Sequence, residues 1–107
     1  MKIVVFVTAA NIAQAKKIAQ ALIKEKLAAC VNIVNPVQSL FWWDNKVDSA
    51  KEALLVIKTK KSLFKRLITK VRSLHSYDVP EIIALPIVAG YKPYLDWIDG
   101  SVRRKGN

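Results

Sequence analysis

The side chains best suited to chemistry gather in one short segment of the C-terminal half. This segment holds the only histidine of the chain, His75, followed by the phenol of Tyr77 and the carboxylates of Asp78 and Glu81. An imidazole and a carboxylate together suit Cu(II), which favours nitrogen and oxygen ligands. Two protein ligands make only a weak site, so Tyr77, Asp78 or Cys30 of a neighbouring subunit are candidate accessory ligands.

Each of these residues also has a structural interpretation that the sequence leaves open. His75 can end a helix, where its charge suits the negative end of the helix dipole and its ring binds a nearby carbonyl. Glu81 can pair with a Lys or Arg across a subunit contact, and Tyr77 can pack its ring while its hydroxyl finds a backbone partner. Cys30 lies in a run of alanine and valine, which is typical of a small buried hydrophobe.

We do not expect an enzyme, although His75 beside Asp78 and Glu81 could in principle support acid–base chemistry. The sequence contains no Gly-rich phosphate loop and no recognisable Ser-His-Asp arrangement, and it has only 3 glycines. A binding protein is the better interpretation.

The composition indicates a single domain over residues 1–107, because 52% hydrophobic residues suffice for one packed core. Lysines interrupt every apolar run before it reaches the roughly 20 residues of a membrane span, so we expect no membrane partner. One cysteine excludes an intrachain disulfide and fits a reducing, cytoplasmic location. The N-terminus also imitates a short signal peptide, but residues 3–7 equally predict a buried strand that cleavage would remove.

The formal charge of +10 is concentrated in the second half of the chain. Between Ala53 and Tyr77 there is no acid, and cations accumulate at Lys58, Lys60, Lys61, Lys65, Arg66, Lys70 and Arg72. Such a face could meet nucleic acid or an acidic membrane, but it is more often a solvated surface. The only ring among these cations, Phe64, falls on an apolar stripe. Without a stacking platform, we expect no nucleic-acid partner.

Hydrophobic periodicity predicts the elements that position these groups. Asn11 is a predicted N-cap, with Gln14 completing a capping box at the start of the first helix. The remaining elements are a strand over 3–7, a strand over 29–43 bent at Pro36, a return strand over 47–57 that completes a long hairpin, a helix from about 62, a strand over 82–88, and a short helix from Pro93 that Gly100 stops. We expect residues 1–101 to form the ordered core and residues 102–107 a loose tail.

This order, β-α-β-β-α-β with an added helix, is the α+β pattern of a ferredoxin-like sandwich with strand order 4-1-3-2. Proline cannot donate to a strand ladder, and Pro36 and Pro86 fall on the two predicted edge strands.

The strands are apolar on both faces of the predicted sheet, yet both long helices cover the same face. We therefore expect a partner chain on the other face, with an interface at Phe41, Trp42 and Trp43; the alternative is that these rings fold back onto their own domain.

Several segments together resemble the CutA family of divalent-cation tolerance proteins. They are Glu-Lys-Leu-Ala-Ala-Cys-Val-Asn at 25–32, Phe-Trp-Trp at 41–43, Lys-Thr at 58–59, His-Ser-Tyr-Asp-Val-Pro-Glu-Ile at 75–82 and Tyr-Leu-Asp-Trp at 94–97. The resemblance spans nearly the whole chain in the same order. It implies a PII-like homotrimer linked to tolerance of copper and other divalent cations, with Cu(II) or another divalent cation bound but not required for folding.

The resemblance also implies metal ligands. The family's proposed ligands are a thiol at the end of the first strand, the His of a His-Pro-Tyr segment and a Glu after the later proline. The last two correspond to His75 and Glu81, whereas Val7 occupies the thiol position and Ser76 replaces the proline. Because a PII-like trimer has clefts between subunits, a sensor of nucleotides or anions without a metal role is the alternative function.

Overall fold

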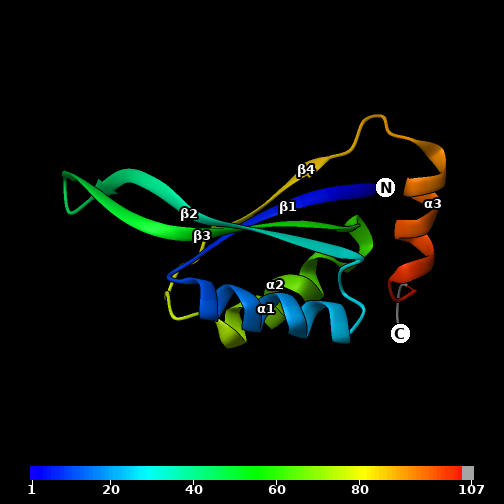
Figure 1. Cartoon of the computed structure of the whole chain (residues 1–107), viewed down its shortest axis with the longest axis horizontal. Helices are drawn as coiled ribbons and strands as arrows, with labels where there is room; N and C mark the ends of the chain where they lie inside the picture. The colour runs from blue at the N-terminus through cyan, green and yellow to red at the C-terminus, as the bar shows by residue number, and fades with distance from the viewer. Residues whose placement is uncertain (105–107) are drawn as a thin grey trace.

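The computed structural model describes residues 1–104 and shows one sheet with two helices on one face and a third helix at one end (Figure 1). The two long strands of the hairpin extend well beyond the other two strands. The elements are β1 (Lys2–Ala9), α1 (Ile12–Lys24), β2 (Cys30–Trp43), β3 (Lys46–Lys60), a 3₁₀ turn (Lys61–Leu63), α2 (Phe64–Leu74), β4 (Ile82–Pro86) and α3 (Lys92–Ser101).

The sheet has the order β2-β3-β1-β4, and all its pairs are antiparallel. The predicted ferredoxin-like order is thereby confirmed, and both prolines lie on edge strands as expected. Strand β4 ends two residues earlier than predicted, although the Ile87 N–H still donates to the Lys2 carbonyl at 3.0 Å.

The predicted start of α1 is confirmed by its capping bonds. The Gln14 N–H donates to Asn11 Oδ1 at 2.9 Å, and Gln14 Oε1 in turn accepts from the Ala10 N–H at 3.3 Å. The side chain of Gln14 therefore reaches one residue further back than a standard capping box requires. The helix begins where its backbone donors find partners.

The core lies between the sheet and the helices. In β1 and in residues 53–59 of β3 every second side chain is buried against α1 and α2, so these segments alternate in burial although the runs 3–7 and 53–57 are apolar throughout. These inward positions are Ile3, Val5, Val7 and Ala9 of β1 and Ala53, Leu55 and Ile57 of β3.

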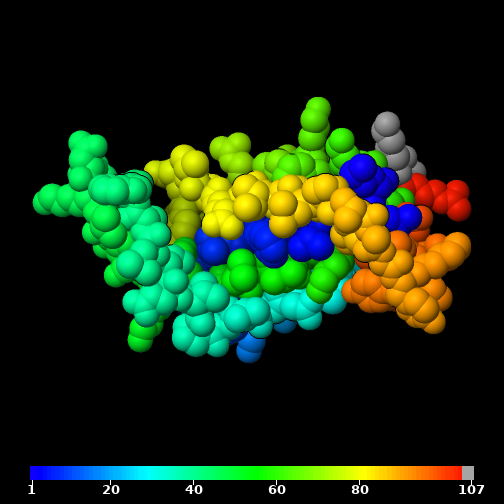
Figure 2. All heavy atoms as spheres, turned by 90° about the horizontal axis from the view of Figure 1, so that it is seen from above, coloured from blue at the N-terminus to red at the C-terminus, as the bar shows by residue number. Residues whose placement is uncertain are grey.

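The opposite face of the sheet is also apolar, and the chain leaves most of it open. Phe6 of β1 pairs with Val56 of β3 and with Ile83 of β4, and Ile83 is 51% exposed. Figure 2 looks onto this face: β1, in blue, runs uncovered between β4 and β3, and α3 covers only one end. There Asp99 of α3 pairs with Lys2 at 3.1 Å, and Ile98 is fully buried.

The C-terminal boundary differs from the prediction. Gly100 lies inside α3, which continues to Ser101. Val102 is only 7% exposed within the core, and the Arg103 N–H donates to the Lys26 carbonyl at 2.9 Å. The expected loose tail therefore does not begin at 102, because an apolar side chain and a backbone bond fix these residues; positions 105–107 lie outside the described residues.

In the part of the chain that the structure describes, no helix is long and apolar enough to cross a membrane.

A buried hydroxyl gives a test of this packing. Thr59 is fully buried, and its hydroxyl donates to the Leu27 carbonyl at 2.7 Å. We expect Thr59→Val to lower the free energy of unfolding by about 1–3 kcal/mol, because the carbonyl loses its donor without regaining water. Chemical denaturation at one fixed protein concentration measures the change.

Thr69→Val is the matched control, because the Thr69 hydroxyl makes an exposed bond to the Lys65 carbonyl. Its effect should stay within about 0.5 kcal/mol. Equal effects of the two substitutions would show that the buried bond has no special role.

Candidate functional site

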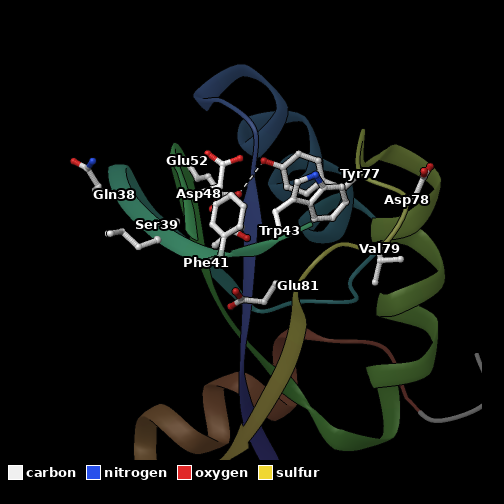
Figure 3. Close-up of a pocket in the computed structure, with 12 residues that line it drawn as sticks. Gln38, Ser39, Phe41, Trp43, Asp48, Glu52, Tyr77, Asp78, Val79 and Glu81 are labelled. Carbon is white, nitrogen blue, oxygen red and sulfur yellow. Dashed lines mark hydrogen bonds between the residues drawn. The ribbon is translucent and has the colours of Figure 1, made fainter. Parts of the chain in front are cut away.

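An open groove of about 910 Å³ lies beside the hairpin. It lies between the outer half of the hairpin, the end of β1 and the segment that joins α2 to β4 (Figure 3). Its lining combines aromatic and acidic side chains with a few small polar ones: Thr8, Gln38, Ser39, Leu40, Phe41, Trp43, Asp48, Glu52, Tyr77, Asp78, Val79 and Glu81. We call this cavity the groove.

Unequal strand lengths create the groove. Strand β1 ends at the pair Ala9 and Ala53, whereas β2 and β3 continue to the pair Trp43 and Lys46. The outer half of the hairpin therefore has no third strand beside it, and the α2–β4 segment runs into the angle that remains.

A bulge in β2 directs the aromatic rings into the groove. Between Val34 and Val37 the strand carries one residue more than β3 opposite. One extra residue transfers every later side chain to the other face. As a result Phe41 and Trp43 share a face with Asp48 and Glu52, and the bulge lies at the bend predicted at Pro36.

The carboxylate of Glu52 is the most buried charged group of the groove, since the residue is only 8% exposed. The Tyr77 hydroxyl donates to Glu52 Oε2 at 2.9 Å, the bond drawn as a dashed line in Figure 3. Burial raises the pKa of Tyr77, and the hydrogen bond and negative charge of Glu52 raise it further. The bond therefore joins the hairpin to the α2–β4 segment across the groove.

The groove is strongly acidic. Asp48, Glu52, Asp78 and Glu81 line it, so it holds 4 of the 8 acids of the chain, and no Lys or Arg among residues 1–104 lines it. Carboxylate oxygens are the donors that hard divalent cations prefer. The groove therefore suits a cation better than an anion.

His75 is not free to bind a metal in this arrangement. The Tyr77 N–H donates to His75 Nδ1 at 3.1 Å, so Nε2 carries the proton and donates to the Thr8 carbonyl at 2.7 Å. Both ring nitrogens are thus used by backbone groups. The alternative given above, a residue at a helix end whose ring binds a carbonyl, describes His75 as the structure shows it.

The predicted site residues divide into two groups. Tyr77, Asp78 and Glu81 line the groove, whereas His75 does not. Cys30 pairs with Lys58 and lies beside Tyr94 of α3, so it belongs to the other end of the sheet. Among residues 1–104, no group of three or more His, Cys, Asp or Glu side chains is placed to hold a metal ion.

Sequence reasoning missed Asp48 and Glu52. Both lie on β3, where the pairing with β2 places them on the same face as Phe41, and Glu52 in addition accepts a hydrogen bond from Tyr77. The one available signal was a charged residue directly before the apolar run 53–57.

The aromatic tip of the hairpin does not fold back onto its own domain. Trp42 is 75% exposed, and Leu40 and Val47 on the same face are exposed as well. Phe41 and Trp43 line the groove but keep part of their surface open.

The model of the CutA1 divalent ion tolerance protein family matches residues 3–101. The chain belongs to this family. Among CutA1 relatives, the chloroplastic CutA 1 of Oryza sativa is 50% identical over 94% of this chain, and the divalent-cation tolerance protein CutA of Archaeoglobus fulgidus is 43% identical over 92%. A solved CutA1 structure from Thermus thermophilus superimposes with a TM-score of 0.94 at 44% identity, covering 96% of this chain and 100% of that one.

The relatives differ in length and location. The chain spans 57% of the Oryza sativa protein and 56% of its Arabidopsis thaliana counterpart, but 95% of the Archaeoglobus fulgidus protein. The plant proteins are named chloroplastic, and the solved Archaeoglobus fulgidus structure is named periplasmic. A cytoplasmic location for this CutA1-family chain therefore stays a prediction. The family description names a tolerance function and no reaction.

The bond between Tyr77 and Glu52 can be tested by Tyr77→Phe. Removing the hydroxyl leaves a buried carboxylate without its donor, and we expect a loss of about 1 kcal/mol of unfolding free energy at pH 8. Because folding raises the pKa of Tyr77, this contribution is complete below pH 10 and disappears as the pH rises through the raised value. The stability difference between wild type and variant should therefore shrink above pH 10.

Tyr91→Phe is the control, since Tyr91 is a largely exposed tyrosine that does not line the groove. Urea titrations at pH 8 and pH 11 measure all three proteins. A difference between wild type and Tyr77→Phe that stays constant across this range would contradict the assignment.

Proposed function

We propose that this CutA1-family chain acts in divalent-cation tolerance as a homotrimer and binds the cation in the groove, at a boundary between subunits. The observation that carries the proposal is the composition of the groove, which gathers four carboxylates and excludes every Lys and Arg of the described chain. Glu81 and Asp78 are exposed and supply the first ligands. Donors from a neighbouring subunit complete the site.

The open sheet face supports the assembly. Phe6, Val56 and Ile83 lie together on this face, and within residues 1–104 only α3 covers its end. Contiguous apolar surface on a small protein is typical of an interface. Both edge strands, β2 and β4, also have free ladder groups, and the aromatic hairpin tip provides further contact area.

A copper site within one chain fits these residues poorly. Cu(II) favours imidazole nitrogen, but both nitrogens of His75 are bound by the backbone. The remaining donors in the groove are oxygens, and they do not converge as a group of three within the described chain. We therefore propose a carboxylate site that a second subunit completes, rather than the combination of His75 and Glu81 expected from the sequence. Folding does not require the cation.

The charge of the groove disfavours the sensor of nucleotides or anions. A nucleotide phosphate needs cationic or backbone N–H donors. The groove instead presents Asp48, Glu52, Asp78 and Glu81. Divalent-cation binding is the function that this chemistry supports.

The proposed trimer predicts a sedimenting species of about three times the 12.0 kDa subunit mass. Ile83→Asp places a charge in the middle of the apolar face and should shift the protein towards smaller species at micromolar concentration. Ile23→Asp, on the exposed side of α1, replaces a side chain of similar exposure and should leave the mass unchanged. A wild-type protein that sediments as a stable monomer would exclude the assembly.

Calorimetric titration tests the cation site on protein of verified mass. We expect Glu81→Gln to weaken Cu(II) and Mn(II) binding at least tenfold, because a carboxylate ligand is lost. His75→Gln, which retains an amide donor for the Thr8 carbonyl, should change the affinity less than threefold. Asp44→Asn in the hairpin turn, away from the groove lining, is the control for net charge.

The reverse result, a large loss with His75→Gln and none with Glu81→Gln, would return the ligand role to the imidazole. Absence of binding to the wild type would remove the cation from the proposed function.

A further inference from the structure

The helical face of the molecule has a charge of opposite sign to the groove. Residues 11–28 and 61–75, which contain α1 and α2 with their flanking turns, carry nine Lys and Arg and a single acid. That acid, Glu25, already pairs with Lys70 at 2.7 Å. The cations are Lys16, Lys17, Lys24, Lys26, Lys61, Lys65, Arg66, Lys70 and Arg72.

The cations form two neighbouring rows on the outer side of the helices. On α1, Lys17 and Lys24 are exposed two turns apart, and on α2, Lys65 and Arg72 repeat the same spacing. A separation of seven residues spans about 10 Å along a helix, and packed helices lie about 8–10 Å apart. The two helices lie side by side beneath the sheet in Figure 1, so the rows form one continuous basic surface.

The chemistry of this surface selects its partner. Among the large hydrophobic side chains of α1 and α2 only Ile23 is exposed, at 43%, and Phe64 packs against the core. A protein that binds single-stranded nucleic acid stacks the bases on exposed rings, and a helix that binds a bilayer inserts aromatic or long apolar side chains. No exposed ring is present on α1 or α2, and Ile23 is a single half-exposed aliphatic side chain, whereas a row of phosphates requires only positive charge.

We propose that the helical face binds the phosphate backbone of duplex nucleic acid without reading its sequence. The expectation of no nucleic-acid partner rested on the missing stacking platform, which matters for single strands and not for a duplex. The helical face is opposite the open sheet face, so duplex binding does not depend on the proposed trimer contacts or on the cation site.

Fluorescence anisotropy with a labelled 20-base-pair DNA duplex of mixed sequence tests the proposal. With four to six phosphate contacts, the affinity should fall by about two to three orders of magnitude between 50 and 200 mM salt. The double variant Lys17→Glu and Lys65→Glu should bind at least tenfold more weakly than wild type at 50 mM salt, and the slope of log affinity against log salt should decrease by about two.

The matched control is Lys46→Glu with Lys51→Glu, which makes the same change in net charge on the exposed hairpin. The proposal is supported if this control binds the duplex as tightly as wild type while the Lys17→Glu and Lys65→Glu variant loses affinity. Equal weakening by both pairs would assign the effect to net charge and overturn it. Absence of duplex binding at 50 mM salt would overturn it too, as would binding only to vesicles with 30% phosphatidylserine.

Discussion

The structure depends on one constraint: the sheet is apolar on both faces, and the helices of its own chain cover only one. Residues of β1 and β3 that point to α1 and α2 are buried. Phe6, Val56 and Ile83 lie on the reverse side, where burial requires α3 or a second molecule. Leaving apolar area in water costs roughly 25 cal/mol for each Å². This cost favours association over an isolated subunit, and in the proposed trimer the hairpin and the groove would lie next to neighbouring copies.

The groove and the basic helical face follow from the same division of the molecule. Half of the acids gather on the side of the open sheet face, beyond the end of β1, and half of the cations gather on the helices. Separating the acids from the cations gathers like charges together, which increases the repulsion within each group but gives each side of the domain a strong local field. Burial of Glu52 strengthens this field within the groove, because its negative charge has a phenol and not a cation as its partner.

Patterns among residues close in sequence predicted the fold. They predicted only those site residues that are also close to one another in sequence. Periodicity and capping chemistry were sufficient to predict the elements, because each signal spans only a few residues. These signals are the Asn11 cap with Gln14, the apolar stripes of the helices and the two prolines. Tyr77, Asp78 and Glu81 were found because they are close in sequence. Glu52 meets Tyr77 across 25 positions, and Phe41 faces the groove only because β2 holds one extra residue, so neither could be read from spacing. His75 was expected to be a ligand because the family resemblance implies it and an imidazole suits Cu(II), but its lone pair is used by a backbone N–H whose position depends on the folded turn.

The position of Val7 explains why the absent first-strand thiol need not disable a cation site. Val7 is fully buried on the helical side of the sheet, with Val5 and Ala9, whereas the next residue, Thr8, lines the groove on the other side. Successive side chains of a strand point to opposite faces, so a thiol at position 7 would enter the core and not the groove. In this conformation the thiol position and Glu81 cannot share one metal. A carboxylate site needs neither the thiol nor the imidazole, and four carboxylates line the groove, which is where the proposed trimer would place a neighbouring subunit.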